Sequence, residues 1–253
     1  MMTTRPRSVV DDLIINLAFY TRLPFPCGPI EGSELARASW AAPLAGAIVG
    51  LVGAVTYSLS WLGHLPPFPA AALAVAATLA ITGCLHEDGL ADVADGLGGT
   101  SRERKLEIMR DSRLGTYGAS ALALSIVLRI SALASLASPV PVAVAFILAH
   151  TAGRAAIPAF MRLVPPARID GLSAGAGRAP KASAAAAAVL GVLALIVGLP
   201  LRCALLALAS AALMLFGLAR LSIKHFGGQT GDVLGAVEQL VEIVVMLSAA
   251  TGA

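Results

Sequence analysis

Charged residues are scarce in this chain. They make up 13% of its 253 residues, whereas a soluble domain carries about 25%. The mean hydropathy is +0.83 and 57% of the residues are hydrophobic. A soluble protein made of buried helices is disfavoured, because the apolar blocks are too many and too long. The net charge of only +3 argues against nucleic acid as a partner.

Cysteine is also rare, and no cleavable leader is evident. Cys27, Cys84 and Cys203 are widely separated, so the sequence predicts inert thiols and neither a disulfide framework nor a cysteine metal site. Asp11 and Asp12 interrupt any apolar core of a signal peptide near the N-terminus. We therefore expect the first hydrophobic span to act as an uncleaved anchor.

Long apolar runs, by contrast, are abundant. Each is close to the roughly 20 residues that cross a lipid bilayer. The predicted fold is an all-α, polytopic membrane helix bundle, with about seven transmembrane helices in a single catalytic domain covering residues 1–253. A shorter mixed segment, residues 10–23, is expected to form an interfacial helix. The expected spans are residues 40–62, 69–85, 117–137, 140–160, 182–199, 201–219 and 233–251.

Lysine and arginine gather in alternate loops. They occur before the first span and in loops 86–116, 161–181 and 220–232, and Arg202 is the one exception in the other loops. Positive loops stay in the cytoplasm, so the N-terminus is predicted to be cytoplasmic and the C-terminus to lie outside. All the long polar loops then face the cytoplasm.

Acidic residues are concentrated in one segment. Seven of the 15 fall between positions 87 and 111. Asp88, Asp92 and Asp95 lie at i, i+4 and i+7, on one face of a helix, where like charges repel. A bound cation would offset this cost, and carboxylates suit Mg²⁺, with Mn²⁺ or Ca²⁺ as alternatives. We predict a metal site at these three residues, which Asp111 could complete; a solvated acidic face is the other interpretation.

Further polar segments on the same side suit phosphate. Arg113 follows Asp111 at a polar kink before a span, and its guanidinium can bind phosphate through two donors. Thr230 lies in a glycine-rich turn whose backbone N–H groups could hold a phosphate, although a helix cap explains that turn equally well. Residues 102–109 are expected to form an amphipathic helix with a solvated face.

Two arginines fall inside predicted spans, where a charge is costly and indicates function. Arg154, with His150 one turn before it, lies toward the cytoplasmic end and is a candidate phosphate ligand; snorkelling to the membrane surface is the alternative. Arg129 lies nearer the middle of its span, and nothing in the sequence explains it. Acidic, basic and glycine-rich segments on one membrane face together predict phosphoryl-group chemistry on a cytoplasmic substrate.

Four segments follow one another along the chain: residues 19–26 (FYTRLPFP), 86–96 (HEDGLADVADG), 109–118 (MRDSRLGTYG) and 227–232 (GGQTGD). In this order they resemble the cobalamin synthase family. The resemblance implies that α-ribazole, or its 5′-phosphate, displaces GMP from adenosylcobinamide-GDP and gives adenosylcobalamin or its 5′-phosphate. It also implies Mg²⁺ as cofactor and a place in the bacterial inner membrane. Glu87 stands where many members carry an apolar residue, so we do not expect it to be an essential ligand.

These residues suggest a division of roles. The aspartates would hold Mg²⁺ against the diphosphate, and Arg113 would bind phosphate oxygens, with Arg22 and Arg154 as further candidates. His86 or Asp232 would take the proton of the attacking 3′-hydroxyl. A homo-oligomer is compatible with the sequence, as is a monomer.

Two other functions fit part of the pattern. A CDP-alcohol phosphotransferase has similar carboxylate spacing, but its usual Ala-Arg pair is replaced here by Ala91-Asp92. A secondary transporter could use intramembrane arginines, but transporters place their polar site near the bilayer midplane between repeats. Here the charges lie at the cytoplasmic boundary, and no repeat is visible in the sequence.

Overall fold

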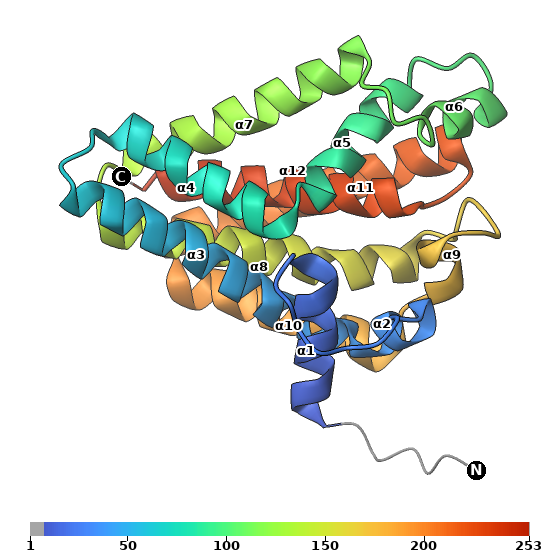
Figure 1. The fold of residues 1–253 in the computed structure, drawn as a ribbon, viewed down its shortest axis with the longest axis horizontal. Helices are drawn as coiled ribbons and strands as arrows, with labels where there is room; N and C mark the ends of the chain where they lie inside the picture. Colours follow the sequence, from blue (N-terminus) through green and yellow to red (C-terminus); the bar gives the residue numbers. More distant parts are fainter. Residues whose placement is uncertain (1–7, 253) are drawn as a thin grey trace.

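The computed structural model describes residues 8–252, and within that range the regular structure is helical, with one isolated β-bridge between Pro166 and Gln229. The prediction of an all-α bundle is confirmed (Figure 1). The elements in chain order are α1 (Val9–Tyr20), α2 (Gly32–Ala38), the 3₁₀ helix η1 (Ser39–Ala41), α3 (Ala42–Leu62), α4 (Pro67–Thr82), α5 (Leu85–Gly96), α6 (Arg102–Ile108), α7 (Thr116–Leu136), α8 (Pro139–Leu163), α9 (Leu172–Ala176), α10 (Lys181–Gly198), α11 (Leu201–Phe226) and α12 (Gly231–Ala250).

Among the described residues, six helical segments are long and apolar enough to cross a membrane, and a bent pair, α4 and α5, makes a seventh if it is counted as one span. This confirms the expected number of about seven. The second expected span, residues 69–85, corresponds to α4 and the bend after it, where the chain turns by 90° into α5. Gly83 (φ 63°) and Cys84 (φ 57°) both adopt the left-handed conformation there, which ends one helix before the next begins.

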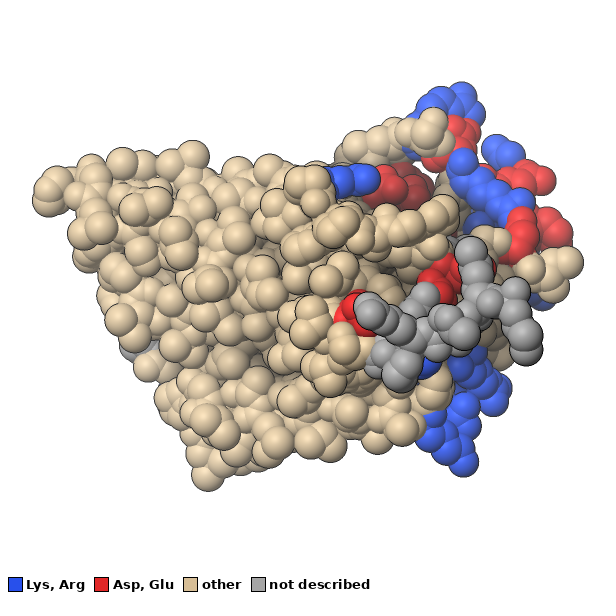
Figure 2. Space-filling view, turned by 60° about the horizontal axis from the view of Figure 1, so that its bottom comes forward, with Lys and Arg blue, Asp and Glu red and all other residues tan. Residues whose placement is uncertain are grey.

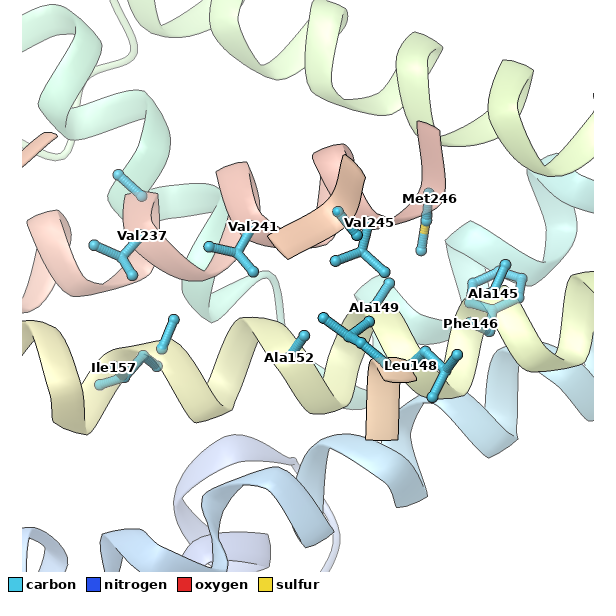
Figure 3. Close-up of a cluster of buried hydrophobic side chains, with 14 of the residues drawn as sticks. Ala145, Phe146, Leu148, Ala149, Ala152, Ile157, Val237, Val241, Val245 and Met246 are labelled. Carbon is cyan, nitrogen blue, oxygen red and sulfur yellow. The ribbon is translucent and has the colours of Figure 1, made fainter. Parts of the chain in front are cut away.

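Glycines allow the central helices to pack closely. A Cβ atom on Gly46 would overlap the carbonyl oxygen of His150, and one on Gly50 would lie 2.6 Å from that of Phe146. The backbones of α3 and α8 therefore touch, which is how small residues drive helix association in membranes. On its other side α8 packs against α12 through apolar residues that include Ala149, Val241 and Val245 (Figure 3).

The surface is divided between apolar and charged regions. Figure 2 shows the visible charges gathered at one end of the molecule, while the rest of that face carries almost none. Large apolar side chains are exposed on α3, α7, α10 and α11, including Leu51, Leu124, Leu193 and Leu213. The chain is thus a multi-pass membrane protein in which lipid replaces water around the apolar region.

The predicted helix at residues 10–23 is present as α1, which lies across the long axis of the bundle (Figure 1). Asp12 fixes it in place, because its carboxylate accepts two hydrogen bonds from Arg37, at 2.8 and 3.2 Å, and one from the Trp40 indole at 2.8 Å. These bonds join α1 to the start of the α2–α3 segment. The position of α1 at a membrane surface stays a prediction.

Candidate functional site

The site is built where α5 and α12 touch. A Cβ atom on Gly89 would lie 2.7 Å from the carbonyl oxygen of Asp232, and one on Gly235 would lie 3.1 Å from that of His86. Only glycine permits this approach. It brings the acidic helix against the start of α12, so that Asp88, His86 and Asp232 line one cavity.

The acidic face predicted for α5 is present. Asp88 is exposed and Asp92 is half-buried on the same helix. Asp92 is partly removed from water, and the charges of Asp88, Asp232 and Asp95 repel its own, while Arg168 attracts it. Burial of a carboxylate among like charges is unfavourable unless a cation or proton compensates, so this cluster has the chemistry of a cation site.

The carboxylates suit Mg²⁺ only together with further ligands. In the described part of the chain, the predicted aspartates do not bring three carboxylate ligands within 4.8 Å of one another. Mg²⁺ does not require this, because it is usually bound by one or two carboxylates, several waters and the phosphates of a substrate. Asp88, Asp92 and Asp232 therefore suit a metal that arrives with a phosphate ligand.

Asp95 lies on the predicted face, where each of its oxygens accepts a hydrogen bond, and its role as a metal ligand stays a prediction. The donors are the backbone N–H groups of Gly115 and Gly118, each at 2.8 Å. A Cβ atom at either glycine would overlap the carboxylate. Asp95 thus anchors the start of α7 to α5, which positions the loop that precedes α7.

That loop carries the predicted Asp111 and Arg113. The Arg113 guanidinium binds the Asp111 carboxylate, with a shortest contact of 2.5 Å between Nη2 and Oδ2, and this partner lowers the pKa of Asp111 to about 2. Arg113 is otherwise exposed. The carboxylate occupies the Nε and Nη2 edge of the guanidinium, and the roles of both residues stay predictions.

Two adjoining cavities open beside the acidic helix. The first, of about 250 Å³, is mainly apolar. The second, of about 210 Å³, is the more polar of the two and shares Ser173, Gly231 and Asp232 with the first. Thr230 lines the second cavity and caps α12 by accepting from the Val233 N–H at 3.2 Å, so the helix-cap interpretation holds for it. The first cavity is lined by Phe19, Tyr20, Leu35, Ala36, Ser39, Leu85, His86, Asp88, Gly89, Ile157, Met161, Ser173, Ala176, Gly231, Asp232, Leu234 and Gly235.

Arg22 lies at the bend between α4 and α5. Its backbone N–H donates to the Ile81 carbonyl at 2.7 Å, and its guanidinium packs on Gly83. It is exposed and follows Tyr20 of the first cavity by two residues. A role as phosphate ligand stays a prediction.

Arg154 lies inside the bundle and not in either cavity. Its Nη1 donates to Glu238 Oε1 at 2.6 Å, and the residue is 1% exposed. The guanidinium also lies over the Tyr20 ring, 5.5 Å from its centroid. The structure therefore gives Arg154 an internal partner in place of the solvent contact that snorkelling would require.

Glu238 joins this interior to the first cavity. His86 Nδ1 lies 3.2 Å from Glu238 Oε2, and His86 also lines the cavity. A glutamate that accepts from Nδ1 fixes the imidazole tautomer and leaves Nε2 as the basic nitrogen. Sequence analysis missed Glu238, although an acidic residue inside an apolar span is a functional signal in itself.

Arg129, the other intramembrane arginine, also has internal partners, and these account for its charge inside a span. Its Nη1 lies 3.0 Å from Glu87 Oε1 and 3.1 Å from Glu242 Oε1. His150 Nδ1 is 2.8 Å from Glu242 Oε2, so the donor atoms of His150, Glu238 and Glu242 come within 4.8 Å of one another. Because Arg129 and Arg154 already neutralise these glutamates, we interpret the group as an ion-pair network and not as a metal site.

The fold and this site define a multi-pass membrane protein that keeps an acidic helix and two adjoining cavities at its charged end. The chain belongs to the cobalamin-5-phosphate synthase family, whose model matches residues 12–250. It is similar to a protein of Bradyrhizobium diazoefficiens named adenosylcobinamide-GDP ribazoletransferase, with 55% identity over 96% of this chain and 95% of the relative. A protein of the same name from Mesorhizobium japonicum is 50% identical over 98% and 96%. No solved structure matches the chain.

Proposed function

We propose that this protein is an adenosylcobinamide-GDP ribazoletransferase, which moves the adenosylcobinamide phosphate group from adenosylcobinamide-GDP to α-ribazole or its 5′-phosphate and releases GMP. The proposal rests on family membership together with one structural observation. Asp88 and Asp232 face a common cavity with a buried, glutamate-held histidine. A phosphoryl transfer needs such acidic and basic groups around one reacting centre.

The reaction requires a base for the acceptor hydroxyl. In the proposed step the 3′-oxygen of α-ribazole bonds to the phosphorus that bears the cobinamide aminopropanol, and the bond from that phosphorus to the GMP oxygen breaks. His86 Nε2 takes the hydroxyl proton, because Glu238 holds Nδ1. Asp232 lines the same cavity and is the alternative base.

Mg²⁺ would be held by Asp88, Asp92 and Asp232 together with the diphosphate of the substrate. When bound, it would neutralise phosphate oxygens and favour the departure of GMP. Asp95 keeps the α7 end of the site in register with α5 through its two backbone hydrogen bonds. The apolar lining of the first cavity, with Phe19 and Tyr20, suits a flat aromatic base.

Detergent-purified protein is expected to release GMP from adenosylcobinamide-GDP in the presence of Mg²⁺ and α-ribazole, with one cobalamin formed for each GMP. No sealed vesicle should be needed, because chemistry and not transport is the activity. Chromatographic measurement of GMP and cobalamin checks this. GMP release that is independent of the acceptor would indicate a hydrolase, and substrate movement across vesicles without GMP release would indicate a transporter.

We further propose that the protein lies in the bacterial inner membrane with the charged end in the cytoplasm, where its nucleotide substrate is. The charge distribution in Figure 2 and the alternating lysine and arginine content of the loops support this orientation.

In a cysteine-free background we expect a cysteine at Thr100 to react with an impermeant thiol reagent only after the inner membrane is opened. A cysteine at His64, in the short loop between α3 and α4, should react in intact spheroplasts. Both positions are exposed, so accessibility reports the side of the membrane. The reverse labelling pattern would contradict the orientation.

A further inference from the structure

The polar cavity is framed by three separate parts of the chain. The α8–α9 loop supplies Arg168 and Asp170, α9 supplies Ser173, and the turn before α12 supplies Gln229 and Thr230. The cavity adjoins the apolar one at Asp232. A ligand in it would lie next to the proposed reaction centre.

Two donors that belong to this cavity have no partner. Gln229 is 1% exposed, and its Nε2 makes no hydrogen bond. Its Oε1 accepts from Ser173 Oγ at 2.6 Å. Arg168 donates from Nη2 to the Leu106 carbonyl at 2.9 Å, but its buried Nε is also unpaired. Buried donors are nearly always satisfied in proteins, so these two indicate an acceptor that comes with a ligand.

Several hydrogen bonds fix the turn that contains Gln229. Gln229 N–H donates to the Pro165 carbonyl and the Ala167 N–H donates to the Gln229 carbonyl, each at 2.8 Å. Arg102 donates to the carbonyls of Phe226 and Ala167, at 2.9 and 3.0 Å. The backbone of this turn is therefore fixed, and Gln229 stands just before the N-terminus of a 20-residue helix, which favours anions.

The charges around the cavity limit what can bind. Arg168 is the one cation among its lining residues, and Asp232 and Asp170 also line it. The charge of Asp170 is paired with Arg110, at 2.7 Å. Asp232 would repel a free anion, so a phosphate should bind well only when a divalent cation occupies the neighbouring carboxylates.

We propose that the cavity is a phosphate subsite, in which the side chains of Arg168 and Gln229 turn toward a bound phosphate and donate to its oxygens beside the N-terminus of α12. The inference rests on the proposed function for the source of the phosphate, which is either GMP or the 5′-phosphate of the acceptor. The donors themselves are independent of that source, since any phosphate monoester presents the same oxygens.

Equilibrium binding to the detergent-purified full chain tests the subsite. The ligands are GMP, α-ribazole 5′-phosphate and inorganic pyrophosphate, with guanosine and α-ribazole as phosphate-free controls, each with Mg²⁺ and with EDTA. The variants are Arg168→Gln and the isosteric Gln229→Glu. Arg104→Gln is the matched control, because its exposed side chain pairs with Glu107 outside both cavities.

With Mg²⁺ we expect both variants to raise the Kd of pyrophosphate and of one nucleotide by about tenfold or more, the effect of losing a charge-assisted hydrogen bond. Guanosine, α-ribazole and the Arg104→Gln control should be unchanged. If the variants lose affinity for GMP and not for α-ribazole 5′-phosphate, the subsite belongs to the leaving nucleotide. If they lose affinity for α-ribazole 5′-phosphate and not for GMP, it belongs to the acceptor. EDTA should weaken phosphate binding to the wild type.

Unchanged Kd values for all three phosphate ligands in folded Gln229→Glu protein would overturn the subsite. That variant decides alone if Arg168→Gln fails to fold through loss of its bond to Leu106. A wild type that binds pyrophosphate through these residues but turns over no adenosylcobinamide-GDP would overturn the proposed function and support the subsite. The two failures are therefore distinguishable.

Discussion

The Asp92→Asn protein is expected to insert and fold normally but to lose about a hundredfold to a thousandfold in kcat/KM. The asparagine side chain would keep the shape of the aspartate and remove one negative charge from a cluster that includes Asp88 and Asp232. A bound cation would then lose a ligand and part of the charge that attracts it. Without the cation, the same change removes repulsion, so the free energy of unfolding should stay level or rise.

Steady-state release of GMP at several Mg²⁺ concentrations, with a thermal unfolding midpoint for each protein, measures both effects. Glu103→Gln is the matched control, because this exposed residue of α6 lies on the same side and its substitution changes the net charge equally. Near-normal turnover of folded Asp92→Asn protein, with unchanged dependence on Mg²⁺, would contradict a metal role for the acidic helix.

The acidic helix could be predicted because its signal is local. A spacing of i, i+4 and i+7 specifies one helix face whatever the rest of the chain does, and α5 has that face. The role of Asp95 could not be predicted in this way. Its partners, Gly115 and Gly118, lie 20 and 23 residues away along the chain, and only folding brings their N–H groups to its carboxylate.

Hydropathy predicts the number of spans but not their shape. A window average cannot register two left-handed residues, so it does not reveal the 90° bend at Gly83 and Cys84. That bend turns α5 out of line with α4 and carries Asp88 and His86 to the cavity. Arg168 and Gln229 could not be predicted from the sequence either. They lie in two turns that are far apart along the chain, and only folding brings these turns together around the polar cavity.

The sequence indicates the partners of the two intramembrane arginines only in part. Glu238 and Glu242 are spaced by four residues in an apolar span, so they share a helix face on which carboxylates need partners. Pairing them with Arg129 and Arg154 would have required knowing which helices are neighbours. The structure supplies this, since α8 and α7 both pack against α12.

Arg129→Met is expected to lower the free energy of unfolding by about 3–5 kcal/mol, the usual effect of removing one partner from a buried ion pair. Arg129 is 1% exposed, and its loss would leave Glu87 and Glu242, 6% and 0% exposed, without their cation. By contrast, Arg104→Met breaks an exposed pair with Glu107 and should change stability by about 0–1 kcal/mol.

The free energy of unfolding is measured by reversible unfolding in mixed detergent micelles, with the helix content as the observed quantity. The double variant Arg129→Met, Glu242→Gln should recover part of the loss, because a neutral amide in place of the carboxylate removes one of the two unpaired charges. If Arg129→Met is as mild as Arg104→Met, the glutamates do not depend on Arg129 for their charge. A residue that only holds α5, α7 and α12 together can affect turnover only through stability. If Arg129→Met leaves stability intact and abolishes turnover, Arg129 therefore serves the reaction and not the fold.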